Sequence, residues 1–200
     1  QLQQRIIWQL GRTMQEKGFQ GIDIDFEYIP AEDRVPFAEF VALVRHILNP
    51  FGYRVSVALA PKTSSDQQGL LYEGVDYRLL GEAADQVMLM TYEWGYTYGP
   101  PMAVAPINMV RRVAEYALTQ IPKEKMPYVR GTTKARTIGN VEAVQLAISH
   151  GASIRFDEQA QSPYFHYAQN GVRHEVWFED VRSYRAKFAL IRELGLKGAG

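Results

Sequence analysis

The sequence predicts an α/β protein, a partial (β/α)8 barrel with a small α+β insertion. Its clearest regularity is a helix followed by a short apolar strand, and three such strands begin 32 residues apart, at Ile22, Arg54 and Gln86. This spacing is the length of one βα unit and favours a parallel sheet whose apolar strands are covered on both faces. A closed barrel of eight units usually takes about 250 residues. We therefore expect this 200-residue chain to be a fragment of a barrel.

Apolar spacing and turn residues predict the individual elements. The first helix occupies residues 1–17 and ends at Gly18, and residues 19–26 are predicted as a buried strand. Further helices are predicted at 33–48, 77–84, 107–121, 140–148 and 180–194, and further strands at 54–60, 86–92, 152–156, 164–168 and 174–178. Asp33, Asn140 and Asp180 are expected N-caps, and Asn170-Gly171 is an expected hairpin turn.

This pattern predicts three regions along the chain. Residues 1–128 form βα units of the barrel without its first strands, residues 129–180 form the α+β lobe, and residues 181–200 form the last barrel helix and the start of a final strand.

Composition excludes several classes of function. The 22 Lys and Arg residues balance 22 Asp and Glu residues, so we expect no nucleic-acid partner, and no apolar stretch is long enough to predict a membrane span. The chain has no cysteine, which excludes thiolate zinc sites and a cysteine nucleophile. Its four histidines lack the spacing of metal ligands, so we expect neither a metal nor a cofactor. No export signal is visible, and we expect any such signal to lie outside this chain.

The segment Asp23-Ile24-Asp25-Phe26-Glu27 is the strongest candidate for chemistry. Its three carboxylates alternate with apolar residues, so in a strand they project from one face about 6.5 to 7 Å apart. Like charges held this close push their pKa values apart, which general acid catalysis requires. Glu27, at the C-terminal end of the strand, is placed as the proton donor. A solvated strand edge or a carboxylate ion site is the alternative interpretation.

The same segment, Gly21 to Glu27, resembles the DGxDxDxE signature of family 18 glycoside hydrolases, the chitinase and N-acetylglucosaminidase group, with Gln20 in place of the leading acidic residue. Met90-Thr91-Tyr92-Glu93 is similar to the second motif of that family, MxYD, with Glu93 where Asp is usual. The longer run from Met90 to Ala103 resembles the spore-germination and cortex-lytic branch. Compared with the family, Lys125 to Val129 is short, so we expect a deletion there.

The resemblance implies a retaining hydrolysis in which the 2-acetamido oxygen of the substrate is the nucleophile. Glu27 would protonate the leaving oxygen and later activate water, while Asp25 would orient the acetamido group and stabilise the oxazolinium ion. Asp23 would set the charge state of Asp25, and Tyr92 would donate a hydrogen bond to the acetamido group. Met90 and Glu93 are expected near the same atoms.

Aromatic side chains supply candidate sugar contacts, because pyranose faces stack on flat apolar rings. Trp94, Tyr96 and Tyr98 follow directly from a predicted strand end, with loop packing as the alternative. Trp177 is predicted either in the core of the lobe or in the wall of a substrate pocket.

The resulting hypothesis is an extracellular or spore-associated hydrolase of β-1,4-linked N-acetylglucosamine polymers, with peptidoglycan of the spore cortex favoured over chitin by branch resemblance. LysM modules elsewhere in the parent chain are an implied partner. A noncatalytic glycan-binding module is the main rival, although Glu27 argues against it. A Mg²⁺-dependent barrel enzyme with Asp23, Asp25 and Glu27 as ligands is a third hypothesis, which sensitivity to EDTA would distinguish.

Overall fold

The fold was analysed in a computed structural model that describes residues 2–95, 100–122, 125, 127–128, 138–196 and 198–199. These residues belong to two compact units. The first unit comprises Gln1–Met90, Val113–Val129 and Gly195–Gly200, and the second comprises Thr91–Arg112 and Arg130–Leu194. The three regions expected from the sequence, 1–128, 129–180 and 181–200, stay a prediction.

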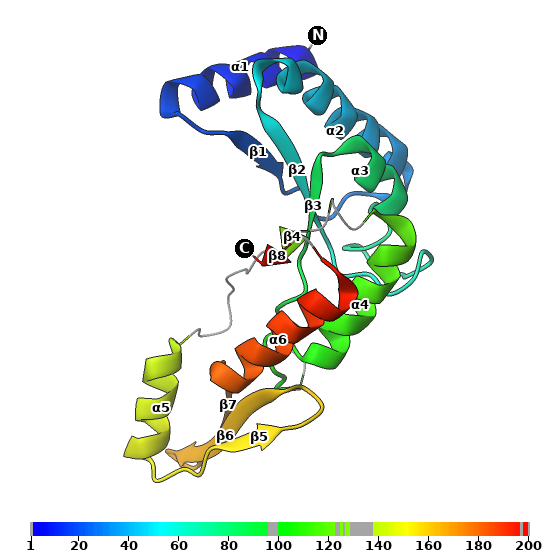
Figure 1. The fold of residues 1–200 in the computed structure, drawn as a ribbon. Helices are drawn as coiled ribbons and strands as arrows, with labels where there is room; N and C mark the ends of the chain where they lie inside the picture. The colour runs from blue at the N-terminus through cyan, green and yellow to red at the C-terminus, as the bar shows by residue number, and fades with distance from the viewer. Residues whose placement is uncertain are drawn as a thin grey trace. The chain divides into compact units, whose positions relative to one another are not determined.

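The first unit alternates helices with parallel strands (Figure 1). Three strands pair side by side in the order β1-β2-β3, and β4 pairs in parallel with β8. The elements in chain order are α1 (Leu2–Lys17), β1 (Gly21–Ile24), η1 (Ala31–Asp33), α2 (Arg34–Leu48), η2 (Asn49–Phe51), β2 (Arg54–Leu59), α3 (Tyr77–Ala83), β3 (Gln86–Leu89), α4 (Ile107–Gln120), β4 (Pro127–Tyr128) and β8 (Gly198–Ala199). The predicted α/β class with a parallel sheet is confirmed, including a strand near the C-terminal end. Helix α4 has residues in both units.

The register of β1, β2 and β3 gives the sheet two chemically different faces. Ile24, Val57 and Val87 align across the strands, and all three are buried. The neighbouring row, Asp23, Ser56 and Gln86, points to the other face, because side chains alternate along a strand. The apolar face packs beneath helices such as α2, whose buried residues include Val41 and Val44. The polar face is therefore the one on which a site can be built.

Two predicted strands end earlier than expected. The first strand ends at Ile24 rather than Phe26, and the third ends at Leu89 rather than Tyr92. Phe26 is 52% exposed, and its ring stacks on Phe37 and Phe40 of α2 at centroid distances of 5.9 and 6.0 Å. This contact draws the chain out of the ladder after Ile24, so the expectation that all three carboxylates lie within the strand was wrong.

The second unit contains a helix on one face of an antiparallel sheet. Its elements are α5 (Asn140–Ser149), β5 (Arg155–Asp157), β6 (Ser162–Gln169), β7 (Val172–Trp177) and α6 (Val181–Leu194), and the strands pair in the order β5-β6-β7. Ala143 and Ala147 of α5 form a core with Phe165 and Phe178. The predicted hairpin turn is confirmed, since Asn170 and Gly171 have φ values of 53° and 75°, as a type I′ turn requires.

Of the three predicted helix caps, Asp180 is confirmed in position and in hydrogen bonding, and Asp33 in position alone. Asp180 accepts hydrogen bonds from the backbone N–H groups of Arg182 (2.8 Å) and Ser183 (3.2 Å). Asp33 occupies the N-cap position of α2, as predicted, but its side chain makes no capping hydrogen bond. The cap position of α5 is Gly139 rather than Asn140, whose side-chain oxygen instead accepts the backbone N–H of Glu179 at 3.0 Å. The side chain of Asn140 thus makes a tertiary hydrogen bond in place of the helix cap that the local pattern predicted.

Asp85 ties the helix layer to the sheet. Its carboxylate, only 6% exposed, accepts hydrogen bonds from Arg45 Nε (2.9 Å), Asn49 Nδ2 (3.1 Å) and the backbone N–H of Val55 (2.9 Å). Burial alone would raise the pKa of Asp85, but these donors and the charge of Arg45 together hold it below its ordinary value.

No helix in the described part of the chain is long and apolar enough to cross a membrane.

We predict that Asp85→Asn destabilises the protein in a pH-dependent way. A lowered carboxyl pKa in the folded state contributes stability above the ordinary pKa of about 3.9, and this contribution is lost as the pH falls through the lowered value. At pH 7 the variant should lose about 1.5 to 3 kcal/mol of unfolding free energy, the usual loss for hydrogen bonds to a charged group. The difference from wild type should shrink below about pH 4 in thermal melts.

Glu82→Gln is the matched control for this variant. The Arg78–Glu82 pair spans 3.9 Å, and both of its side chains are more than 60% exposed. Removing such a pair should change stability by less than about 1 kcal/mol. A pH-independent effect of Asp85→Asn would contradict the interpretation.

Candidate active site

The acidic segment begins in β1 and continues past its C-terminal end. Asp23 is within the strand, whereas Asp25 and Glu27 follow it. All three side chains are exposed, and Ile24 between the first two is buried. The C-terminal ends of barrel strands are where barrel enzymes bind substrate and place catalytic residues.

Asp23 has a direct partner in the neighbouring strand. Ser56, its register partner in β2, donates its hydroxyl hydrogen to Asp23 Oδ1 at 2.5 Å. Although Asp23 is exposed, the surrounding strands partly desolvate its carboxylate, which raises its pKa. The Ser56 hydrogen bond lowers this pKa in part, and the nearby charge of Asp25 raises it further. The net result is a raised pKa, and desolvation contributes more to it than the charge of Asp25 does.

The backbone next to Glu27 is strained. Tyr28 has a φ of 57°, in the left-handed region that residues other than glycine rarely adopt. Such a conformation persists only where the surrounding structure holds it, and it is found often at functional sites. The position of Glu27 is therefore determined by packing around the segment rather than by the strand ladder.

The second predicted motif follows β3. The backbone N–H of Met90 donates to the carbonyl oxygen of Leu59 at 3.0 Å, which carries the parallel pairing one residue beyond the strand. Since β1 and β3 are parallel, Met90 and the acidic segment leave the same edge of the sheet.

The residues after Met90 belong to the second unit. Tyr92 is half-buried, and Glu93 is exposed with a φ of 61°, in the same left-handed region as Tyr28. The indole Nε1 of Trp94 donates to the carbonyl oxygen of Thr91 at 3.3 Å, which fixes the ring against its own turn. Tyr96 and Tyr98 lie outside the described residues.

Trp177 lies on the face of the antiparallel sheet opposite the α5 core. It pairs with Tyr164 across the strands, and the two rings stack at 4.7 Å. The neighbouring pair, Phe165 and Val176, faces the α5 core instead. Glu175 accepts a hydrogen bond from Trp177 Nε1 at 2.7 Å and pairs with His166 Nε2 at 2.8 Å, so the indole is held in place while its ring stays partly exposed.

Two polar residues of these surroundings were not predicted from the sequence. Ser56 is a single hydroxyl among apolar strand residues, and its position on the polar face was the available signal. Glu175 is visible only through pairing across the hairpin. The Ser56–Asp23 and Glu175–His166 contacts do not follow from spacing along the chain, whereas Glu175 and Trp177 share a strand face two residues apart.

The acidic residues do not assemble into a metal site. Within the part of the chain that the structure describes, no group of three or more His, Asp or Glu side chains is placed to hold a metal ion. Asp23, Asp25 and Glu27 therefore lack the convergent geometry that the Mg²⁺ hypothesis requires.

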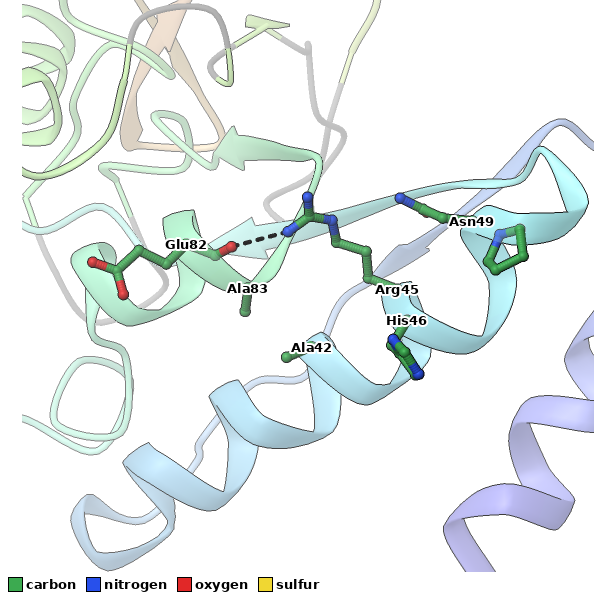
Figure 2. Close-up of a pocket in the computed structure, with 7 residues that line it drawn as sticks. Ala42, Arg45, His46, Asn49, Glu82 and Ala83 are labelled. Carbon is green, nitrogen blue, oxygen red and sulfur yellow. Dashed lines mark hydrogen bonds between the residues drawn. The ribbon is translucent and has the colours of Figure 1, made fainter.

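One hollow, of about 540 Å³, lies on the helix-covered side of the first unit (Figure 2). It is lined by residues of α2, η2 and α3. Arg45 donates a hydrogen bond to the carbonyl oxygen of Glu82 at 3.1 Å, and Figure 2 marks this bond. Its lining residues are Ala42, Arg45, His46, Asn49, Pro50, Glu82 and Ala83. None of the predicted site residues lines it, so we assign it no catalytic role.

Comparison with known sequences gives a consistent set of relatives. The family model described as "Glycosyl hydrolases family 18" matches residues 1–200. The cortical fragment-lytic enzyme of Bacillus subtilis (strain 168) is 45% identical over 212 aligned residues, which cover 98% of this chain and 49% of that protein. The chain thus spans about half the length of the curated relatives it matches.

Comparison with solved structures agrees with the comparison of sequences. The spore cortex-lytic enzyme SleL of Bacillus megaterium QM B1551 superposes with a TM-score of 0.90 and 40% identity, over 98% of this chain and 48% of that one. A chitinase from Chromobacterium violaceum ATCC 12472 superposes with a TM-score of 0.88 and 28% identity, over 98% and 65%. The fold of this chain therefore matches that of these enzymes over nearly its whole length.

We predict opposite pKa shifts of Asp23 in two variants. Ser56→Ala removes a donor to the charged carboxylate and should raise the pKa of Asp23 further, whereas Asp25→Asn removes a like charge and should lower it. Titration of the Asp23 carboxyl carbon by NMR measures both. Shifts in the same direction, or none, would show that these two groups do not control Asp23.

Proposed function

We propose that this chain, which belongs to family 18 of the glycosyl hydrolases, carries the catalytic acid of a retaining hydrolase that cleaves β-1,4-linked N-acetylglucosamine polymers. One observation carries the proposal. Asp23, Asp25 and Glu27 lie at and beyond the C-terminal end of a parallel strand, with exposed side chains and a raised pKa at Asp23. A purely structural strand end would not gather three carboxylates, because their mutual repulsion opposes folding.

In the proposed first step, the acetamido group of the substrate acts as the nucleophile. Its carbonyl oxygen attacks the anomeric carbon while the bond to the leaving sugar breaks, and Glu27 transfers its proton to the leaving oxygen. The product is a cyclic oxazolinium ion, whose positive charge Asp25 stabilises. Tyr92 donates a hydrogen bond that holds the acetamido group.

In the second step, Glu27 acts as the base. Its carboxylate takes a proton from water, the water oxygen attacks the anomeric carbon, and the oxazolinium ring opens with retention of configuration. Asp23 sets the charge of Asp25, since two neighbouring carboxyl groups resist simultaneous ionisation. The raised pKa of Asp23 supports this role.

Sugar binding is assigned to residues beyond the acidic segment. Met90 and Glu93 are proposed near the acetamido group, and Trp94, Tyr96, Tyr98 and Trp177 as ring platforms. The partial exposure of Trp177 on the sheet face opposite the α5 core supports a platform role.

Peptidoglycan of the spore cortex is the proposed substrate, and spore association the proposed location. Support comes from relatives named as a cortical fragment-lytic enzyme and a spore cortex-lytic enzyme, at 45% and 40% identity. LysM modules elsewhere in the full protein remain part of the proposal. Chitin is the second candidate, favoured by the similarity to a chitinase at 28% identity.

We predict that Glu27→Gln in the full-length protein abolishes turnover and preserves sugar binding. The substitution removes one transferable proton with almost no change in shape, and loss of general acid catalysis costs about 10²- to 10⁴-fold or more. Mass spectrometry of digested spore cortex and of chitin oligomers measures turnover and identifies the substrate. Hydrolysis by the variant at a near wild-type rate would overturn the assignment.

The neighbouring-group mechanism generates a further prediction. A substrate with glucose at the cleaved residue lacks the acetamido nucleophile and should not turn over, and a thiazoline mimic of the cyclic ion should bind more tightly than substrate. Asp25→Ala should weaken binding of the mimic far more than binding of plain oligosaccharide, as measured by calorimetry. Equal cleavage of both substrates would instead favour Asp25 as a direct nucleophile.

A further inference from the structure

We propose that Lys62, Arg34 and Gly74 form a buttress that positions Glu27 for proton transfer. This inference rests on the proposed function of Glu27 as the catalytic acid. It concerns three positioning residues, none of which needs to touch the substrate. Lys62 and Gly74 lie in the segment between β2 and α3, which leaves the sheet at the same edge as the acidic segment, and Arg34 is the first residue of α2.

Lys62 is the centre of the buttress. Its side chain is 2% exposed, and Nζ donates hydrogen bonds to three backbone carbonyl oxygens, those of Ser65 (3.3 Å), Tyr72 (3.2 Å) and Val75 (2.8 Å). A buried ammonium group is costly unless it is fully hydrogen-bonded. Breaking these bonds is therefore unfavourable, and residues 65–75 are held folded around the ammonium group.

Tyr77 fixes the start of the same segment. Its buried hydroxyl donates to the carbonyl oxygen of Ala60 at 2.7 Å and accepts the backbone N–H of Lys62 at 2.9 Å. Lys62 is thus anchored to α3 through its backbone and to the segment through its side chain. Burial and the nearby positive charge of Arg34 lower the pKa of Lys62, while Asp76 and Asp66 oppose the shift.

The buttress meets the acidic segment at Gly74. A Cβ atom placed on Gly74 would lie 2.1 Å from the carbonyl oxygen of Ile29, so the two backbones pack together with no room for a side chain. The preceding carbonyl, that of Glu73, accepts hydrogen bonds from Arg34 Nε (2.9 Å) and Nη2 (2.5 Å). Arg34 begins α2, so these bonds tie the start of α2, which follows the acidic segment in the chain, to the segment that contains Gly74.

These contacts surround Glu27 on both sides in the chain. Phe26, one residue before it, stacks on α2, and Ile29, two residues after it, abuts Gly74. Tyr28, between Glu27 and Ile29, holds the left-handed backbone with a φ of 57°. If Ile29 is released, this strained residue can relax and carry Glu27 away from its position.

The test measures kcat and KM of Lys62→Met, Gly74→Ala and Arg34→Gln in the full-length protein, on an N-acetylglucosamine oligosaccharide. We expect kcat to fall about tenfold or more with KM within about twofold, since small misplacement of a catalytic group costs up to about 10²-fold. The loss should be smaller for the same oligosaccharide with a dinitrophenyl leaving group, which needs little protonation. General structural damage would lower both rates equally.

Lys125→Met is the matched control for the lysine. Lys125 Nζ also donates to two backbone carbonyl oxygens, those of Gly81 (2.9 Å) and Ala84 (3.1 Å), but these lie at the end of α3. Gly81→Ala, whose Cβ would lie 3.0 Å from the Ile121 side chain, is the control for Gly74→Ala. Both controls should keep kcat within about twofold, measured below their melting temperatures.

Each outcome decides the proposal. Unchanged kcat in the buttress variants, equal losses with both leaving groups, or the same losses in the controls would overturn it. If Lys62→Met does not fold, Arg34→Gln decides, because Arg34 is partly exposed and its replacement leaves no buried charge. An active Glu27→Gln variant would instead refute the proposed function, whereas an inactive Glu27→Gln with fully active buttress variants would refute the buttress alone.

Discussion

The alternation of side chains along three hydrogen-bonded parallel strands constrains every other part of the first unit. The register aligns Ile24, Val57 and Val87 on one face, so the helices must cover that face to remove it from water. The same register leaves Asp23 and Ser56 together on the opposite face, where a hydroxyl can meet a carboxylate. A shift of one residue would exchange the two faces and bury the acid among the helices, at a high desolvation cost. The apolar packing and the acidic site are thus two results of one register.

Beyond the strand ends, different forces take over. After Ile24 the ladder no longer holds the chain, and side-chain stacking of Phe26 on α2 and backbone contact of Ile29 with Gly74 replace it. Such contacts fix a loop as firmly as strand pairing does, provided that the supporting loop is itself ordered. Here a buried ammonium group supplies that order, since its hydrogen bonds go to backbone oxygens from three different points of one segment. The hydrogen bonds of Lys62 therefore order the loops beyond the strand ends, as hydrophobic burial orders the helices against the sheet.

The features predicted correctly from the sequence are those that depend on residues close together in the chain. Period and apolar alternation predicted the parallel strands, the Asn170-Gly171 turn and the Asp180 cap, because each depends on residues close in the chain. Asp33 occupies its predicted cap position without a capping hydrogen bond. The predicted cap at Asn140 was wrong, because its side-chain oxygen accepts a distant backbone N–H instead. In the candidate site, the acidic motif predicted which residues gather, but not where β1 ends or that Ser56 contacts Asp23. The supports at Lys62 and Gly74 join segments far apart in the chain, so no local pattern could have revealed them.

The contacts of Lys62 also bear on how this segment can change over evolutionary time. The ammonium group binds main-chain oxygens, which every residue type provides, so substitutions at Ser65, Tyr72 or Val75 leave its acceptors present. Gly74 has no such freedom, because any side chain there collides with Ile29. Sequence drift in this loop can therefore alter the surface offered to different polymers while the geometry beneath it is inherited unchanged. Within this one short segment, the side chains can vary while the backbone contacts that hold its conformation are kept.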